Sequence, residues 1–356
     1  MTGSNVKKIL LVDDSALMRR VLCDIIESTG EFKVEDKASD GVFALDYLQK
    51  KQYDAMVLDI NMPRMGGLEL MKELNRRKMR VKILVSSTDT VEGAKVTMDA
   101  LELGALDFIH KPENQNEYRD KHFINRFVSL LRTVVESSPQ IPGGPVTRPA
   151  STDVVGRAPS ARPGRRLVAL ASSTGGPKAL QRVIPLLPAN MDAPMLVVQH
   201  MPEGFTASLA ERLNGLSQVT VSEAVEGERL EKGHVYISRG GKHMNVVTTG
   251  TSVKIRYTDE PPREGVKPCA NYMYESLCNA PYDEICCVVM TGMGMDGTRG
   301  IGKLRREKKL HVIAQSQSTC AVYGMPKSIV TNGYSDKIAD LDDIAKEIVL
   351  NVGVRA

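Results

Sequence analysis

Aromatic residues are scarce in this sequence, and tryptophan is absent. Aromatic residues make up 4% of the 356 positions, so an apolar interior has to be built mainly from aliphatic side chains and the 17 methionines. No apolar run approaches the roughly 18 residues that a membrane-spanning helix needs. The N-terminus also lacks the apolar segment of a secretion signal. We therefore expect a cytoplasmic protein that is neither exported nor inserted into a membrane.

Cysteine and charge patterns exclude further classes of protein. The six cysteines are scattered, without the spacing of a zinc site or of a secreted disulfide framework, which predicts reduced thiols. The formal net charge of +4 is mild, and no basic stripe is interleaved with aromatic residues, so a nucleic-acid partner is not expected. Hydrophobic residues make up 42% and charged residues 25%, which is typical of a globular chain.

The pattern of apolar residues divides the chain into three parts. Residues 1–136 contain five short apolar runs that alternate with helical patterns, and this βα rhythm predicts an α/β domain with a doubly wound parallel sheet. Residues 137–165 hold six prolines and four glycines, which predicts a flexible linker; a simple tether is favoured over one that also docks on a partner. The βα rhythm returns over residues 166–356 and predicts a second doubly wound domain, with β-hairpins between residues 218 and 258.

Three acidic residues and one lysine in the first part lie at the ends of apolar runs. Asp13 and Asp14 end the first run, Asp59 ends the third, and Lys111 follows the fifth. The carboxyl ends of parallel strands converge, so we expect these side chains to meet. Mg²⁺ prefers oxygen ligands, and the three aspartates with a backbone carbonyl near Asn61 are the candidate magnesium ligands. Asp59 would be the phosphoacceptor, and Lys111 would pair with the phosphoryl oxygens.

Two further residues of this part would respond to a phosphoryl group. Ser86, at the end of the fourth run, would move to hydrogen-bond its oxygens, and Phe108 would follow that movement as an aromatic switch. Lys111–Pro112 is a candidate cis peptide bond that would turn the lysine inward. The alternative is that Asp13 and Asp14 merely cap a helix. The joint pattern, in the right order on the right strands, disfavours this alternative.

These positions together resemble the receiver domain of two-component response regulators. The resemblance covers residues 7–130 or so and includes each functional position named above. It implies a flavodoxin-like fold and Mg²⁺-dependent phosphorylation of Asp59.

Three segments of the second part each end a predicted strand with a residue that can do chemistry. Residues 167–177 run from a strand through Ser173 into two glycines and a helix that starts with a proline. A second strand ends in His200, and a third runs into a glycine-rich turn that carries Asp296. Parallel strands end in one crevice, so a nucleophile, a base and an orienting acid can meet there. The sequence thus predicts a Ser–His–Asp site.

Each of these segments also has an alternative interpretation. Ser173 fits a helix cap or an anion cradle, and a lone histidine such as His200 is often structural. Residues 292–297 spell G-x-G-x-x-G, the dinucleotide-binding pattern. The dinucleotide interpretation is disfavoured because the next predicted strand, over residues 310–314, ends without an acid to hold a ribose, and Asp296 would repel a pyrophosphate.

The second part resembles the catalytic domain of chemotaxis protein-glutamate methylesterases, and a receiver joined to this domain is the architecture of that family. The resemblance covers about residues 165–350. The motifs that carry it are Ala171-Ser172-Ser173-Thr174-Gly175-Gly176, Gln199-His200-Met201-Pro202, Thr291-Gly292-Met293-Gly294-Met295-Asp296-Gly297 and Tyr323-Gly324-Met325-Pro326. By this resemblance Ser173 is the nucleophile, His200 the base and Asp296 the orienting acid of a Rossmann-like esterase domain. The resemblance also implies that the backbone N–H groups of Thr174 and Met293 would form the oxyanion hole.

The resemblance implies a substrate and a form of regulation. The enzyme would hydrolyse glutamate γ-methyl esters of chemoreceptors without a cofactor, and would also deamidate specific receptor glutamines. A chemotaxis histidine kinase would phosphorylate Asp59 with Mg²⁺. The receiver would pack over the Ser173 crevice at rest, and phosphorylation would favour another packing. A regulator whose second half only binds an anion is the main alternative. A transcriptional output domain is discounted, because no helix-turn-helix with a basic face is visible after residue 166.

Three positions depart from the family pattern. Ser238-Arg239 stands where a small residue and proline are usual, Asn271 stands where an aspartate is common, and Ser316-Gln317 replaces an acidic pair. None of these belongs to the predicted triad. The departures bear on contacts of substrate loops. The receptors and sites used, the physiological weight of deamidation and the oligomeric state do not follow from the sequence.

Overall fold

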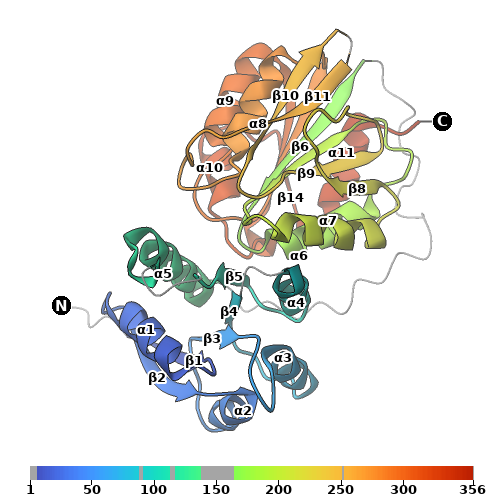
Figure 1. Ribbon diagram of the computed structural model, residues 1–356. Helices are drawn as coiled ribbons and strands as arrows, with labels where there is room; N and C mark the ends of the chain where they lie inside the picture. The colour runs from blue at the N-terminus through green and yellow to red at the C-terminus, as the bar shows by residue number, and fades with distance from the viewer. Residues whose placement is uncertain (1–5, 88–90, 113–116, 138–163, 251, 356) are drawn as a thin grey trace. The chain divides into compact units, whose positions relative to one another are not determined.

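The computed structural model describes five stretches of the chain (Figure 1), which are residues 6–87, 91–112, 117–137, 164–250 and 252–355. The chain divides into two compact units, Met1–Pro145 and Val146–Ala356. The division falls inside the predicted linker, most of which, residues 138–163, lies outside the described residues. No helix in the described stretches is long and apolar enough to cross a membrane.

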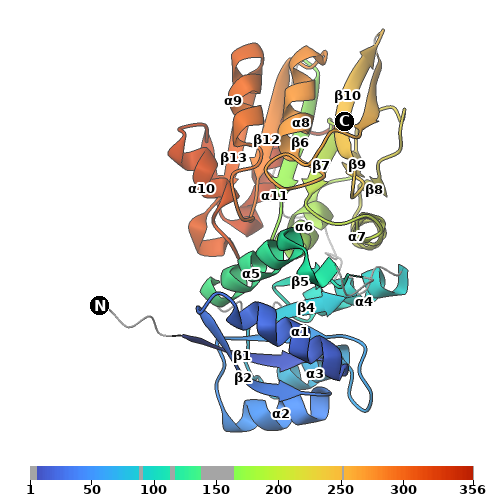
Figure 2. The same cartoon turned by 60° about the vertical axis from the view of Figure 1, so that its left-hand side comes forward.

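The first unit is a parallel five-stranded sheet with helices on both faces. The strand order is β2-β1-β3-β4-β5, which is the flavodoxin-like order. The elements are β1 (Lys7–Val12), α1 (Ala16–Glu27), β2 (Phe32–Ala38), α2 (Gly41–Lys50), β3 (Ala55–Asp59), α3 (Gly67–Arg76), β4 (Ile83–Ser87), α4 (Val91–Glu102), β5 (Asp107–His110), the 3₁₀ turn η1 (Glu117–Arg119) and α5 (Lys121–Glu136). Helices α1 and α5 lie on one face, and α2, α3 and α4 lie on the other (Figure 2).

Covering the sheet on both faces explains why its central strands are apolar throughout. All five residues of β3 and all five of β4 are buried. The two strands pair in register, so that Asp59 lies beside Ser86 at the carboxyl edge of the sheet. The sheet order therefore brings the polar residues that end β1, β3 and β4 to one edge.

The second unit contains a parallel seven-stranded sheet in the order β14-β13-β12-β6-β7-β9-β8. Its strands are β6 (Arg166–Ser172), β7 (Met195–Gln199), β8 (Thr220–Glu223), β9 (His234–Ile237), β12 (Glu284–Val289), β13 (Lys309–Gln315) and β14 (Lys337–Ala339). Its helices are α6 (Gly176–Val183), α7 (Phe205–Leu216), α8 (Ala270–Ser276), α9 (Thr298–Glu307), α10 (Met325–Thr331) and α11 (Ile344–Val352), with 3₁₀ turns η2 (Ile184–Leu186), η3 (Leu277–Asn279), η4 (Gln317–Thr319) and η5 (Leu341–Asp343). Helices α6, α7 and α11 cover one face and α8, α9 and α10 the other (Figure 1). Both units thus have the predicted doubly wound parallel architecture.

The segment between residues 218 and 258 is only partly a hairpin. Strands β10 (His243–Thr249) and β11 (Ser252–Thr258) form the predicted antiparallel pair. The hairpin prediction is wrong for β8 and β9, which pair in parallel inside the main sheet. Parallel pairing needs a crossover, and the loop that makes it runs along β11, where the Leu230 N–H donates to the Val253 carbonyl at 3.0 Å.

The core of the second unit is mainly aliphatic, and two large tyrosines are buried within it. Tyr236 and Tyr274 are among the largest fully buried side chains. The hydroxyl of Tyr274, on α8, lies 3.3 Å from the carbonyl of Ala169 in β6 and 3.2 Å from that of Val288 in β12. A buried hydroxyl needs such partners, and here they hold α8 across the two central strands.

Candidate functional site

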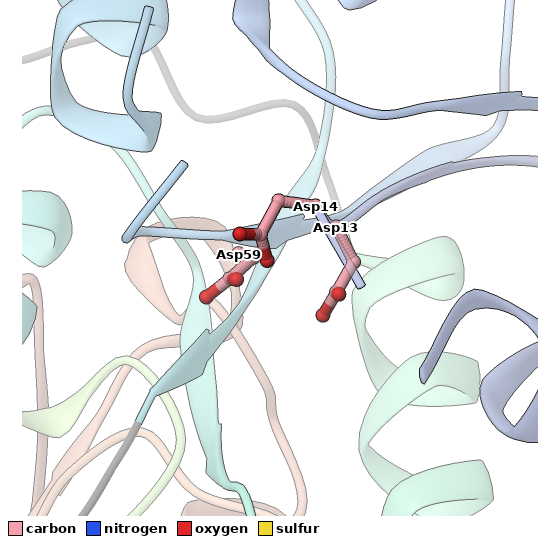
Figure 3. A group of neighbouring side chains, drawn as sticks. All are labelled: Asp13, Asp14 and Asp59. Atoms are coloured by element: carbon pink, nitrogen blue, oxygen red, sulfur yellow. The ribbon is translucent and has the colours of Figure 1, made fainter. Parts of the chain in front are cut away.

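The first unit carries a cluster of carboxylates at the carboxyl edge of its sheet. Asp13 and Asp14 follow β1, Asp59 ends β3, and one ligand atom from each lies within 4.8 Å of the others (Figure 3). Asp13 and Asp59 are buried, whereas Asp14 is exposed. Three carboxylates at this separation fit a divalent cation with oxygen ligands that keeps several waters, as Mg²⁺ does.

Lys111 reaches into this cluster. Its Nζ atom lies 2.8 Å from Oδ2 of Asp13 and 2.8 Å from Oδ2 of Asp59. Burial raises the pKa of Asp59, and the charge of Lys111 opposes this effect. Burial lowers the pKa of Lys111, but the charges of Asp59 and Asp13 outweigh it and raise the pKa overall. The lysine is therefore held as a cation against the buried carboxylates.

The remaining residues predicted for this site surround Asp59. Ser86 is buried beside it in β4, and Phe108 is buried in β5. The backbone N–H of Asn61 donates to the Asp59 carboxylate. The prediction of a cis peptide bond at Lys111–Pro112 is wrong. Within the described stretches, the cis peptide bond is at Lys267–Pro268.

Arg19 belongs to the same site, and sequence reasoning missed it. Its Nη1 atom donates to the backbone carbonyls of Asp13 and Asp14, at 2.5 and 3.0 Å. The guanidinium thus fixes the turn that carries both acids. An arginine in the first turns of α1 gives no local sign of this contact, because its partners are backbone atoms.

In the second unit, Ser173 lies in the sharp turn between β6 and α6. The Ser173 N–H donates to the Thr291 carbonyl at 3.0 Å, which joins this turn to the end of β12. Gly175, at the start of α6, has φ +75°, a conformation that favours glycine. A Cβ on Gly176 would lie 2.0 Å from the Gln199 side chain, so the close approach of the turn to β7 also requires glycine.

His200 follows β7 directly and faces Asp296. Its backbone N–H donates to the Ser172 carbonyl at 3.1 Å, and its Nε2 atom lies 2.8 Å from Oδ2 of Asp296. Both side chains are almost fully buried. Since Nε2 is engaged by Asp296, Nδ1 is the ring nitrogen that would take the proton of Ser173 in the predicted triad. The described residues show no hydrogen bond between the Ser173 hydroxyl and the His200 ring; such contacts are often long in the free enzyme.

Four further donors surround the Asp296 carboxylate, and sequence reasoning found none of them. The backbone N–H groups of Ala270, Asn271 and Gly297 lie 2.6, 3.0 and 2.8 Å from its oxygens, and the Cys269 thiol lies 3.0 Å away. Burial raises the pKa of Asp296, but hydrogen bonds from His200, the thiol and the amides lower it overall. The carboxylate is therefore held ionised where it can orient an imidazole.

The two residues predicted for an oxyanion hole lie on the loops beside Ser173. Thr174 is buried directly after it, and Met293, in the loop after β12, is 38% exposed. A Cβ on Gly292 would lie 2.8 Å from Cβ of Ser173, so the Met293 loop passes close to the serine. This close approach brings both predicted backbone donors to the same turn.

The residues at the three positions that depart from the family pattern each contact a different part of the second unit. Nε of Arg239 lies 3.2 Å from Glu223. Asn271 is buried, and its Oδ1 accepts from the Gly300 N–H at 2.7 Å. Ser316 hydrogen-bonds Asp340. Asn271 is thus a structural link between α8 and α9, in addition to its backbone contact with Asp296.

Comparisons with known proteins agree on both units. The response regulator receiver domain family matches residues 9–122, and the CheB methylesterase family matches residues 168–348. A "Protein-glutamate methylesterase/protein-glutamine glutaminase" of Bacillus licheniformis is 40% identical over 96% of this chain and 97% of its own length. The protein of that name from Bacillus subtilis is 38% identical over 96% of this chain and 97% of its own length.

Among solved structures, the Thermotoga maritima CheB methylesterase catalytic domain is similar to the second unit. It is 38% identical, with a TM-score of 0.51 over 53% of this chain and 99% of that domain. The two family matches fall on the two units described above, one on each. The chain therefore belongs to the CheB family of receiver-linked methylesterases, whose curated relatives are called protein-glutamate methylesterases/protein-glutamine glutaminases.

Proposed function

We propose that this protein is a phosphorylation-activated hydrolase that removes methyl groups from glutamate γ-methyl esters of chemoreceptors in chemotactic adaptation. The observation that carries the proposal is the 2.8 Å contact between His200 and the buried Asp296, beside the turn of Ser173. The names of the relatives support the substrate class. We place the activity in the cytoplasm, with the receptor as substrate.

In the proposed reaction the Ser173 hydroxyl attacks the ester carbonyl while Nδ1 of His200 takes its proton. The negative oxygen of the tetrahedral intermediate is held by the backbone N–H groups of Thr174 and Met293. The imidazolium, stabilised by Asp296, gives its proton to the methoxide oxygen, so methanol leaves and an acyl-enzyme remains. Water, deprotonated by His200, then releases the glutamate carboxylate and Ser173. This chemistry uses no cofactor.

The same groups act on a glutamine side chain. Its amide carbonyl has the geometry of the ester carbonyl, and ammonia leaves in place of methanol. The printed names of the relatives, which include "protein-glutamine glutaminase", support this second activity. It yields the same acyl-enzyme and therefore the same glutamate product.

For the first unit we propose phosphorylation of Asp59 by a chemotaxis histidine kinase. Asp13, Asp14, Asp59 and a backbone carbonyl near Asn61 would hold Mg²⁺, whose charge would offset that of the carboxylates and the phosphoryl group. Lys111, whose Nζ atom lies 2.8 Å from Oδ2 of Asp59, would pair with the phosphoryl oxygens. Ser86 and Phe108 would respond to the new group, and the response would raise hydrolysis in the second unit.

The test is methanol release from a methylated chemoreceptor. Ser173→Ala is expected to abolish release from the phosphorylated full-length protein, because no acyl-enzyme can form. Ser217→Ala is the matched control, since this buried hydroxyl has no hydrogen-bond partner among the described residues and lies at the end of α7. Wild-type release by Ser173→Ala would refute Ser173 as the nucleophile. No release by the wild-type protein itself would favour the alternative in which the Ser-Thr-Gly-Gly turn only binds an anion.

A further inference from the structure

Cys269 presents its thiol to the Asp296 carboxylate. The residue precedes α8, is fully buried, and its Sγ atom lies 3.0 Å from Oδ1 of Asp296. An ionised carboxylate only accepts hydrogen bonds, so the thiol must be the donor. Burial and the charge of Asp296 raise the pKa of the Cys269 thiol, which therefore keeps its proton at neutral pH.

The donors are divided unequally between the two carboxylate oxygens. Oδ2 faces His200 and the Ala270 N–H, whereas Oδ1 faces the Cys269 thiol and the N–H groups of Asn271 and Gly297. A carboxylate offers about four lone-pair sites, so five donors leave it no free direction. Among the described residues, Cys269 supplies the one side-chain donor to Oδ1. Its loss would leave Oδ1 held by the backbone N–H groups of Asn271 and Gly297 alone, with a weaker restraint on the direction of the carboxylate.

Cys269 is itself held by a buried histidine. The Cys269 N–H lies 3.2 Å from Nδ1 of His243, whose Nε2 atom lies 3.2 Å from the Pro261 carbonyl. Because Nδ1 accepts a hydrogen bond, the proton of the neutral ring is on Nε2, which donates to Pro261. A chain of hydrogen bonds thus runs from Pro261 through His243, Cys269 and Asp296 to His200.

We propose that Cys269 is a positioning residue for ester hydrolysis, whose S–H group holds the Asp296 carboxylate with Oδ2 directed at His200. The inference rests on the proposed function, because it assigns Cys269 a part in the same hydrolysis. The thiol itself does not react, since it is buried and protonated. It acts through Asp296 on the orientation of the imidazole.

The experiment compares Cys269→Ala with Cys269→Ser in the phosphorylated full-length protein, by methanol release from a methylated chemoreceptor. Cys269→Ala is expected to lower kcat about 10-fold at unchanged KM. This loss is at the low end for removing a hydrogen bond to a charged group, because a thiol is a weak donor. Cys269→Ser is expected to restore most of kcat, because a hydroxyl donates to a carboxylate at least as well as a thiol does. Wild-type kcat in Cys269→Ala, or no recovery in Cys269→Ser, would overturn the assignment.

Cys286 provides matched control variants in the same unit. It is fully buried in β12, and its thiol has no hydrogen-bond partner in the described part of the chain. Cys286→Ala and Cys286→Ser are expected to keep the wild-type kcat. Serine should be less stable than alanine at position 286, where its hydroxyl is unpaired, and more stable than alanine at position 269, where it has an acceptor. The reverse order at position 269 in urea unfolding would contradict the proposed hydrogen bond.

The Ser173→Ala variant separates this inference from the proposed function. Methanol release by Ser173→Ala would refute the proposed function and with it the role of Cys269. An inactive Ser173→Ala together with a wild-type Cys269→Ala would refute only the role of Cys269.

Discussion

Nε2 of His200 lies 2.8 Å from Oδ2 of Asp296, although 96 positions separate the two residues in the chain. They meet because β7 and β12 are the two neighbours of β6 in a parallel sheet, and all three strands end at the same edge. The chain leaves β6 toward β7 on one side and later returns to β12 on the other. Ligands of open α/β sheets bind at such a switch point.

Replacing Asp296 by asparagine is expected to lower kcat severely. The asparagine amide would present an N–H group to the donors that face a carboxylate in the wild type. The neutral amide also could not stabilise the His200 imidazolium. In a serine protease the comparable change costs about 10⁴-fold in kcat. Methanol release measures the effect. Asp192→Asn is the control, because this buried carboxylate pairs with Lys232 and precedes β7 at the opposite end of the strand from His200; similar losses in both variants would argue against a specific role.

Asp296 should also make the folding stability of the protein depend on acid pH. Its pKa is lowered in the folded state from an ordinary value of 3.8. Its contribution to the free energy of unfolding is therefore present above that ordinary value and is lost as pH falls through the lower folded pKa. Urea unfolding from about pH 5 to pH 2 should show a shallower loss of stability in Asp296→Asn than in the wild type. Parallel pH curves for the two proteins would show that the carboxylate is not held as described.

Asp59→Asn is expected to abolish activation by a small phosphodonor and to leave basal methanol release unchanged. The amide cannot form the acyl phosphate, whereas the residues proposed for hydrolysis lie in the other unit. Asp54→Asn is a suitable control, because Asp54 precedes the same strand and its carboxylate accepts the Lys8 N–H at 2.8 Å. Full activation of Asp59→Asn would refute phosphorylation at this residue.

Removing divalent cations should have the same effect as Asp59→Asn. Within the described residues, Asp13, Asp14 and Asp59 form the one cluster of acidic, histidine or cysteine side chains that could hold a metal ion. Chelation by EDTA is therefore expected to prevent activation by the phosphodonor and to leave basal hydrolysis intact. Added Mg²⁺ should restore activation. A loss of basal activity in EDTA would mean that hydrolysis itself requires a metal.

Two glycines of the second unit should respond to alanine in opposite directions. A Cβ on Gly240 would lie 2.2 Å from the backbone of Pro202, just after His200, so Gly240→Ala should displace this loop, reduce activity and destabilise the fold by about 1–3 kcal/mol. A Cβ on Gly215, in α7, meets nothing within 4 Å. Gly215→Ala should therefore stabilise the protein by about 0.5–1 kcal/mol without changing kcat. Urea unfolding and methanol release distinguish the two variants.

Much of the fold could be predicted because the relevant signals are local. A buried parallel strand shows itself as a short apolar run, and a strand that ends in a functional residue places that residue at one edge of the sheet. This argument located Asp59, Ser173, His200 and Asp296 at strand ends. It failed for β8 and β9, because their parallel pairing depends on where the connecting loop packs and not on the pattern of either strand.

The groups that donate hydrogen bonds around Asp13, Asp14 and Asp296 could not be predicted from the sequence. Arg19 acts on backbone carbonyls, and Cys269 acts on a carboxylate 27 positions away. Neither contact has a pattern of residue types that identifies it in the chain. Asn271 stands out as a departure from the family pattern, but its backbone N–H bond to Asp296 is independent of the side chain.

The amino-acid sequence by itself determined the order of strands and helices and which polar residues end the strands, because apolar periodicity and strand ends are properties of neighbouring residues. Only the tertiary structure decided which nitrogen of His200 faces Asp296, and which groups hold that carboxylate. Three of those groups, at residues 269–271, lie at the start of α8, so they depend on how α8 packs across β6 and β12. That packing is settled by contacts between segments far apart in the chain, including the buried hydroxyl of Tyr274.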